Sequence, residues 1–523
     1  MFEDASSSRC VSLPLRGYER MMTVADNASV KVSHVMVLCG SADAVSAFLK
    51  HGPQALALTF NKHPRMRVKQ VRGQFAMAEV HPAITTQTVL EDKLFGVREV
   101  TSDPTEKWES YVESESNTPT DRYTSFPFYL RVWHYPNENN LLRLMLFSDH
   151  YMSDGITGLT VLNDVLEFAS TLSRDNRVLA PTLPLRPTLY DMWLTPKSWW
   201  SLTTSEWIVS LFGKMVFSSE MKNFTPVIPV RSDQSHFQVP IKINTSSALF
   251  GQGTRENMLA ASKRCKEEGV TFFGALAASI VVAFYIAKHG DKELMSSDPL
   301  FKLAAELDYN MRRRVEHPAP EAQVGCYFTT AGIERVSKEG VDMPNTRFWD
   351  LAREVKKSID EQVDSFLTPF QLILVDQHVH TETVEKFARD VKIPNSVASD
   401  VDISNVGKYP HKYVHAFRTS EGKTSELTIK TVHVHSSVPH LGSAASMYVS
   451  SVDTLCYSMM HKYESKDATT LFAAFTTAVD HVGQVSTRDT MLDVVKRVRK
   501  QIEKQVFPEE AAGTTGQQAP TAA

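Results

Sequence analysis

Residues 271–287, TFFGALAASIVVAFYIA, place the strongest limit on what this chain can fold into. The stretch has no charged side chain, so nearly all of it must be buried. A membrane span needs about 20 consecutive apolar residues. This stretch is shorter and is interrupted by Gly274 and Ser279. We therefore expect a helix inside a large folded domain, with a membrane span as the alternative.

Length and composition favour a globular protein with more than one domain. The chain has 523 residues, more than one hydrophobic core usually supports. Hydrophobic residues make up 42% and charged residues 22%. The formal charge is only -4 and no basic run occurs, which argues against nucleic acid as a partner. The N-terminus lacks the apolar segment of a secretory signal, so we expect a cytoplasmic location.

The cysteines do not indicate a metal site. Five of them are spread along the chain: Cys10, Cys39, Cys265, Cys326 and Cys456. They form neither a CxxC pair nor a Cys/His cluster by spacing, and their number is odd. His433 and His435 alternate as residues of one strand face do, which explains their spacing without a metal. We expect no bound metal, no disulfide framework and no bound cofactor.

Hydrophobic spacing predicts alternating helices and strands on both sides of a distinct middle segment. Helical spacing occurs at 41–59 and 156–168, and apolar runs at 128–135 and 141–147 flank a turn-forming sequence, which predicts a hairpin. The expected regions are an N-terminal lobe at 12–185, a crossover at 186–245, a C-terminal lobe at 246–506 and a disordered tail at 507–523.

The crossover is rich in proline and tryptophan. It contains Trp193, Trp199, Trp200 and Trp207 among many aliphatic residues. Packing against the lobes is the simpler interpretation. An exposed amphipathic helix that contacts a membrane peripherally is the alternative.

The segment SDHYMSDG, at 148–155, carries the chemistry. It lies where a predicted strand ends and a predicted helix begins. His150 can accept a proton near neutral pH, because the unperturbed pKa of histidine is about 6.5. Asp154 can hold the turn through a buried pair with a cation, and Gly155 permits close backbone approach. The HxxxDG spacing alone is weak evidence, because many histidines are structural.

Further segments occur in a familiar order. They are PLRGYER at 14–20, HPRMR at 63–67, EGVT at 268–271, NMR at 310–312 and ISNVG at 403–407. With HxxxDG, this order resembles the chloramphenicol-acetyltransferase-like superfamily, which includes condensation domains, wax-ester synthases and fungal alcohol acetyltransferases. The resemblance extends over residues 12–500. Condensation domains usually carry HHxxxDG, and here Asp149 replaces the first histidine.

The resemblance implies an α/β (α+β) fold of two lobes. Each lobe has a mostly antiparallel or mixed sheet with flanking helices, and the active site lies in the tunnel between them. The implied activity is transfer of an acyl group, first of all acetyl, from acyl-coenzyme A as co-substrate to a small hydrophobic alcohol. One alternative is a condensation-type enzyme that joins a carrier-bound thioester to an amine or hydroxyl. Another is a non-catalytic binding module.

The resemblance also assigns residues to roles. His150 is the general base, and Asp154 points away from the substrate to pair with Arg312. Arg313 and Arg314 compete for that pairing. Candidate groups near the reaction's oxyanion are Ser404, Asn405 and backbone amides near Gly155. Ser404 and Asn405 also have a plainer interpretation as turn formers.

Overall fold

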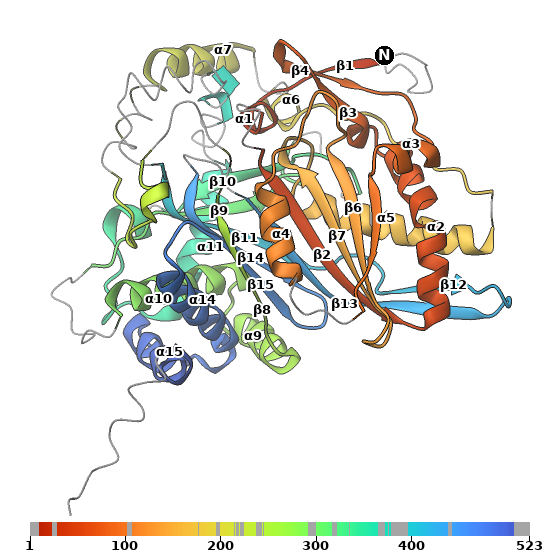
Figure 1. Ribbon diagram of the computed structural model, residues 1–523. Coiled ribbons are helices and arrows are strands. Elements are labelled where there is room, and N and C mark those ends of the chain that lie inside the picture. The colour runs from red at the N-terminus through yellow and green to blue at the C-terminus, as the bar shows by residue number, and fades with distance from the viewer. Residues whose placement is uncertain are drawn as a thin grey trace, which may run out of the picture.

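The computed structural model of the chain contains two six-stranded sheets and one three-stranded sheet, with helices on their faces (Figure 1). It describes residues 10–23, 29–101, 107–175, 177–194, 199–213, 215, 219, 224–236, 243, 245–290, 300–315, 322–333, 335–364, 372–374, 376–377, 396–437 and 442–506. The predicted tail at 507–523 and part of the crossover lie outside these residues. The architecture confirms the predicted two-lobed α+β class.

The first sheet forms the N-terminal lobe. Its order is β12 (Val414–Arg418), β13 (Thr424–Ser436), β2 (Lys31–Gly40), β7 (Leu141–Asp149), β6 (Phe128–Tyr135) and β5 (Phe95–Glu99). Helices α2 (Ala42–Lys62) and α5 (Gly155–Arg174) share a hydrophobic core with one face of this sheet. Helix α4 (Trp108–Asn117) packs on Val35, Met145 and Phe147 of the other face. β6 and β7 are the predicted hairpin.

The second sheet is mixed. Its order is β10 (Phe328–Gly332), β9 (Ala305–Asn310), β11 (Ser399–Lys408), β14 (Ser443–Ser451), β15 (Leu455–His461) and β8 (Ser247–Gln252). β11 runs parallel to β9 and β14, and the other neighbours are antiparallel. The helices around this sheet are α9 (Arg255–Glu267), α10 (Phe272–His289), α11 (Phe348–Asp364), α14 (Ser465–Asp480) and α15 (Met491–Val506) (Figure 1).

Helix α10 is the apolar stretch that the sequence singled out. By length and composition it could cross a membrane, with a mean hydropathy of 1.6 over 18 residues, but 72% of it is buried inside the fold. Every residue from 274 to 286 is buried. It packs against α11 and α14, so it forms a core helix of the second lobe.

Strands β12 and β13 cross between the lobes. They come from the C-terminal half of the chain, yet β13 pairs antiparallel with β2 of the first sheet. In Figure 1 these blue strands continue the red and orange sheet. The predicted range 246–506 treats the second lobe as one continuous stretch of sequence. Strands β12 and β13 lie within that range but belong to the first sheet. The short connection after β13 returns the chain to β14 of the second sheet.

The described part of the crossover is partly exposed. It contains α6 (Leu189–Leu194), α7 (Trp199–Ile208) and the single π-helical turn η3 (Val209–Gly213). Trp193 is buried, whereas four large apolar side chains are more than half exposed: Trp207, Leu211, Phe212 and Met215. Trp193 thus packs against the rest of the fold, whereas membrane contact by the exposed part of the crossover stays a prediction.

The remaining elements are short. β1 (Val11–Pro14), β4 (Gln74–Val80) and β3 (Val68–Val71) form the three-stranded sheet in that order. The other helical turns are α1 (Tyr18–Met21), η1 (Pro64–Arg67), α3 (Thr86–Glu91), η2 (His150–Met152), η4 (Ser232–Gln234), η5 (Arg335–Glu339) and η6 (Val482–Gln484).

A glycine sets how closely α5 approaches β2. A Cβ on Gly158 would lie 2.1 Å from the ring of His34, which is itself fully buried. That ring hydrogen-bonds through Nε2 to the carbonyl oxygen of Gly155 at 2.8 Å. Burial lowers the pKa of His34 to about 4, so the ring is neutral near pH 7. The position of the first turn of α5 therefore depends on Gly158.

We expect Gly158→Ala to lower the thermal unfolding midpoint, because the buried His34 ring has no room to move. Overpacking of this kind typically costs about 1–3 kcal/mol. Gly332→Ala is the matched control, since a Cβ there meets open space. Melting curves of both variants and the unaltered chain test this. Equal midpoints for the two variants would contradict it.

Candidate active site

The HxxxDG motif forms the connection between β7 and α5. The chain leaves β7 at Asp149, makes the 3-10 turn η2, and enters α5 at Gly155. The backbone N–H of His150 donates to the carbonyl of Val30 at 2.8 Å. The Ser148 hydroxyl donates to that of Ser153 at 2.8 Å. These bonds fix the turn on both sides of the histidine.

His150 has the geometry of a general base. Its Nδ1 lies 2.8 Å from the carbonyl oxygen of Ser153. A carbonyl can only accept, so Nδ1 carries the proton and Nε2 keeps a lone pair. Burial lowers the pKa of the imidazole below its usual value, and the Ser153 carbonyl and the charge of Asp154 oppose this only in part. The ring is therefore neutral near pH 7 and able to accept a proton.

The second lobe contributes the neighbour of this histidine. The ring of Phe328, the first residue of β10, lies 5.0 Å from the His150 ring between centroids. The ring of Tyr18 stacks on that of Phe328, with centroids 5.2 Å apart. His150 is partly exposed and lies where the two lobes meet. Its position at this junction suits a group that serves a substrate held between the lobes.

Asp154 is the structural centre of the motif. It is the N-cap of α5, and its Oδ1 accepts from the backbone amides of Ile156 and Thr157 at 3.1 and 2.8 Å. Its Oδ2 accepts from the amide of Tyr327 at 2.9 Å. Arg312 donates to both carboxylate oxygens, at 2.8 and 3.0 Å. The side chain of Asp154 thus serves α5 and Arg312, not a substrate.

The charge pair is almost completely buried. Asp154 is 4% exposed and Arg312 is 1% exposed. Burial alone would raise the pKa of Asp154, but Arg312 and the backbone amides hold it below its usual value. Arg312 also donates to the Thr157 hydroxyl at 3.0 Å. Of the three adjacent arginines, Arg312 is thus the one placed against Asp154, whereas Arg313 and Arg314 are exposed.

The weaker sequence elements meet around this pair. Arg65, from HPRMR, forms a buried ion pair with Glu19, from PLRGYER, at 2.7 Å. The Tyr327 ring lies within 5.7 Å of the Arg65 guanidinium and 5.0 Å of the Arg312 guanidinium. Burial raises the pKa of Glu19 to about 7, and Arg65 opposes that rise. Segments distant in the sequence thus pack together beneath the HxxxDG turn.

Gly155 packs closely against β11. A Cβ on Gly155 would lie 3.2 Å from the Val406 side chain, so the ISNVG element touches the motif here. Asn405 uses its Oδ1 to accept from the amide of Gly407 at 3.2 Å. Ser404 lies opposite Asp308 of β9 and acts to lower the pKa of that carboxyl group, against the effect of burial. The predicted role of Asn405 in a turn therefore explains the position of its side-chain oxygen. The side-chain nitrogen takes no part in that hydrogen bond.

Sequence reasoning missed the partner of Asp149. This carboxylate stands in place of the first histidine of HHxxxDG, and it accepts from Arg122 Nε at 2.8 Å. Both side chains are at most 1% exposed. Where condensation domains usually have a histidine, this chain thus has an aspartate in a buried ion pair with Arg122. The only signal in the sequence was the aspartate itself at this position of the motif.

A row of carboxyl groups lies on the face of the second sheet that is turned to the first lobe. Glu306 pairs with Asp402, and Asp308 with Ser404, across β9 and β11. The alternate residues of these strands point into the α10 core. Burial, then Glu306, raises the pKa of Asp402 to about 7. Burial and the charges of Asp402 and Glu306 raise the pKa of Asp308 well above its usual value.

The order of the two sheets, with β12 and β13 of the C-terminal half added to the first sheet, is the feature of the fold that comparison with known proteins can test. Comparisons of the sequence with protein-family profiles and with curated proteins find no match. Comparison with solved structures finds 190 matching chains, and those reported below share the fold.

The matching structures cover nearly the whole chain at low identity. Trichothecene 15-O-acetyltransferase from Fusarium sporotrichioides has a TM-score of 0.66 at 13% identity, over 92% of this chain and 98% of its own. An epimerization domain of tyrocidine synthetase B has a TM-score of 0.57 at 10% identity, over 92% and 98%. The first condensation domain of the calcium-dependent antibiotic synthetase has 0.55 at 11%, over 92% and 98%. These likenesses confirm the predicted fold.

We expect Arg312→Met to destabilise the chain strongly, because it leaves the Asp154 carboxylate buried and unpaired. Breaking such a pair typically costs about 3–5 kcal/mol. Arg314→Met is the matched control, since Arg314 and Asp360 are 3.9 Å apart and well exposed, where a pair contributes about 1 kcal/mol at most. Urea unfolding measures both. Similar unfolding free energies for the two variants would contradict the assigned role of Arg312.

We expect Asp402→Asn to stabilise the chain at about pH 8 but not at about pH 4. The pKa of Asp402 is raised to about 7 in the folded state, so the unfolded state releases its proton first as pH rises. Between the lower pKa of Asp402 in the unfolded chain and its pKa of about 7 in the folded chain, the carboxyl group therefore lowers the free energy of unfolding as pH rises. An amide has no such effect. Thermal midpoints at both pH values test this, with the exposed Asp453→Asn as control. A pH-independent difference would refute it.

Proposed function

We propose that this chain is an acyltransferase that moves an acyl group, first of all acetyl, from an acyl-coenzyme A thioester to a hydroxyl group. The observation that carries the proposal is His150, which is neutral, oriented through Nδ1 by Ser153, and placed where the two lobes meet. Its Nε2 is the proton acceptor. The shared fold with an acetyltransferase supports this assignment without extending its substrate to this chain.

The proposed step is a direct transfer. Nε2 of His150 removes the proton of the acceptor hydroxyl as its oxygen attacks the thioester carbonyl. The tetrahedral intermediate collapses, the carbon–sulfur bond breaks, and the leaving thiolate takes the proton from the imidazolium. No covalent enzyme intermediate is formed. Asp154 is a positioning residue here, because its carboxylate is fully engaged by Arg312 and backbone amides.

Stabilising the oxyanion requires hydrogen-bond donors near the reacting carbon. The amides of Ile156 and Thr157 already donate to Asp154, which leaves the amide of Gly155 as the candidate at this end of α5. The side-chain nitrogen of Asn405 is the second candidate. Ser404, which lies opposite Asp308 on β9, is the third.

The surroundings support a hydrophobic acceptor. Phe328 lies beside His150, and Val406 lies beside Gly155, so the motif is flanked by apolar side chains. The exposed Trp207, Leu211 and Phe212 of α7 and η3 support peripheral contact of a cytoplasmic protein with a membrane, from which such an acceptor would be drawn.

The carboxyl row on β9 and β11 favours a second candidate function. A cationic amine would offset the repulsion among Glu306, Asp308 and Asp402 that contributes to the raised pKa values there, which an aliphatic alcohol would not do. A condensation-type reaction would then form an amide, with the thioester held on coenzyme A or a carrier protein. A binding module would retain ligand binding without turnover, and the intact His150 geometry favours catalysis over that alternative.

We expect purified protein to release free thiol from acetyl-coenzyme A or longer acyl-coenzyme A in the presence of mixed alcohols and amines. His150→Ala should lower that rate about 100-fold or more, the usual size of general-base catalysis. His51→Ala, on α2, is the matched histidine control and should keep full activity. Product analysis then distinguishes ester from amide.

Equal thiol release by His150→Ala and the unaltered protein would overturn the assignment of the base. Release with amines alone would select the second candidate. Tight acyl-coenzyme A binding without release by either protein, and none with carrier-bound thioesters, would favour the binding module.

A further inference from the structure

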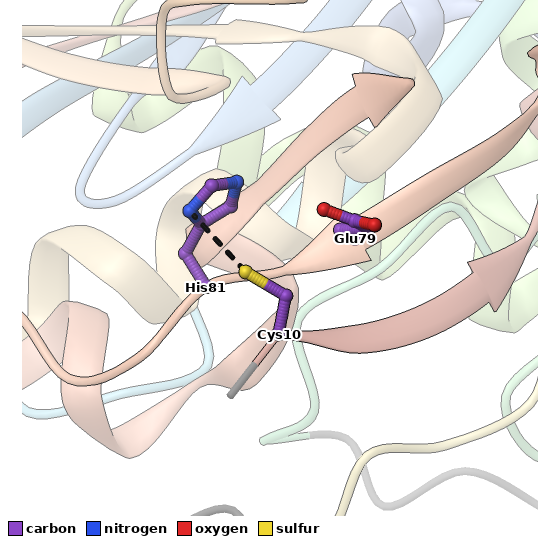
Figure 2. Close-up of side chains that lie close together, drawn as sticks. All are labelled: Cys10, Glu79 and His81. Atoms are coloured by element: carbon purple, nitrogen blue, oxygen red, sulfur yellow. Dashed lines mark hydrogen bonds between the residues drawn. The ribbon is translucent and has the colours of Figure 1, made fainter. Parts of the chain in front are cut away.

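A group of possible metal ligands lies on the three-stranded sheet, separate from the HxxxDG turn. Figure 2 shows Cys10, Glu79 and His81 close together, with the sulfur and the imidazole turned toward each other. Cys10 directly precedes β1, Glu79 lies within β4, and His81 directly follows β4. Spacing in the sequence gave no indication of this group, because Cys10 and His81 lie 71 residues apart.

The register of the sheet explains why these residues meet. Val11 pairs with Val80 and Ser12 with Glu79, so the next pair in the antiparallel register is Cys10 with His81. Side chains of a directly opposed pair point to the same face, and Glu79 lies two residues from His81 on that face. Three potential ligands of different chemistry therefore share one small area of surface.

The separations are close to those of a tetrahedral zinc site. The Cys10 sulfur and His81 Nδ1 are 3.8 Å apart. The three potential ligand atoms, one from each residue, all lie within 4.8 Å of one another. Zn–S and Zn–N bonds of about 2.3 and 2.1 Å place tetrahedral ligand atoms about 3.5 Å apart. Binding would thus draw the ligand atoms together by roughly 1.3 Å or less, within the reach of side-chain rotation.

The backbone beneath the group is held in place. The His81 amide donates to the Arg67 carbonyl at 2.9 Å, and Arg67 Nε donates back to the His81 carbonyl at 3.0 Å. The His81 ring packs edge-on against Phe126, with centroids 6.0 Å apart. The Lys69 ammonium lies 4.2 Å from the centroid of the Phe126 ring. Burial, and then the charge of Lys69, lower the pKa of His81. The imidazole is therefore restrained and neutral.

We propose that Cys10, Glu79 and His81 form a Zn²⁺ site with three protein ligands and a fourth position open to water. Thiolate, imidazole and carboxylate are the ligands that zinc prefers, whereas Mg²⁺ and Ca²⁺ prefer oxygen alone. Cys10 is exposed, so an ion has access. On binding, the Cys10 thiol releases its proton to solvent and a sulfur–zinc bond forms, while neutral His81 donates its Nδ1 lone pair. The ion joins β1 to β4.

The test is a titration of the full chain, free of any affinity tag, with Co²⁺ as a spectroscopic probe for zinc. We expect a sulfur-to-cobalt charge-transfer band and the visible bands of tetrahedral cobalt, at one ion per chain. Cys10→Ser should abolish the charge-transfer band. His81→Ala and Glu79→Gln should weaken Co²⁺ binding about tenfold or more. Stoichiometric Zn²⁺ should remove the spectrum, and Mg²⁺ should not.

Cys39→Ser is the matched control, because Cys39 is the other cysteine that is not buried, and its variant should keep the spectrum. A second measurement guards against misfolded variants: Zn²⁺ should raise the melting temperature of the unaltered chain and of Cys39→Ser, but not of Cys10→Ser. No charge-transfer band, or a band that survives Cys10→Ser, would overturn the proposal.

Discussion

The ion pair between Asp154 and Arg312 is the interaction on which the arrangement of this protein depends. It joins the N-terminus of α5 in the first lobe to Arg312 of the second, which lies two residues after the end of β9. Burying a carboxylate costs free energy unless its oxygens accept good hydrogen bonds. Here Asp154 receives two hydrogen bonds from Arg312 and three from backbone amides. The same carboxylate thus caps a helix and fixes the junction of the lobes.

This pair explains how the surroundings of His150 are maintained. A base must be held within a fraction of an ångström of its reacting position. His150 lies four residues before Asp154, in a turn whose exit into α5 is held by that carboxylate. Tyr327, whose amide donates to Asp154, directly precedes Phe328, which lies beside the imidazole. The second lobe therefore reaches His150 through the same contact that stabilises the first.

Hydrophobic spacing along the sequence predicted the helices and the hairpin that short stretches of sequence determine. The helix at 156–168 corresponds to α5, the hairpin to β6 and β7, and the apolar stretch to α10. The central strand β2 was missed, because it is buried on both faces and shows no alternation. A buried apolar run of that kind cannot be told from a short helix by periodicity.

Long-range pairings account for the rest of what the sequence did not reveal. Asp149 and Arg122 lie 27 residues apart, and neither type announces a partner. Cys10 and His81 lie 71 residues apart and meet only through the register of β1 and β4. The Asp154 to Arg312 contact spans 158 residues, and it was predictable only because the family resemblance supplied it.

The exchange of β12 and β13 has a consequence for how the chain folds as it is made. β2 is complete at Gly40, but its partner β13 starts only at Thr424. During synthesis at roughly 5–20 residues per second, this edge of the first sheet stays unpaired for many seconds. An unpaired apolar edge is a template for association with other chains. The N-terminal lobe therefore completes its sheet late, and until β13 has been synthesised the free edge of β2 must be kept from pairing with other chains.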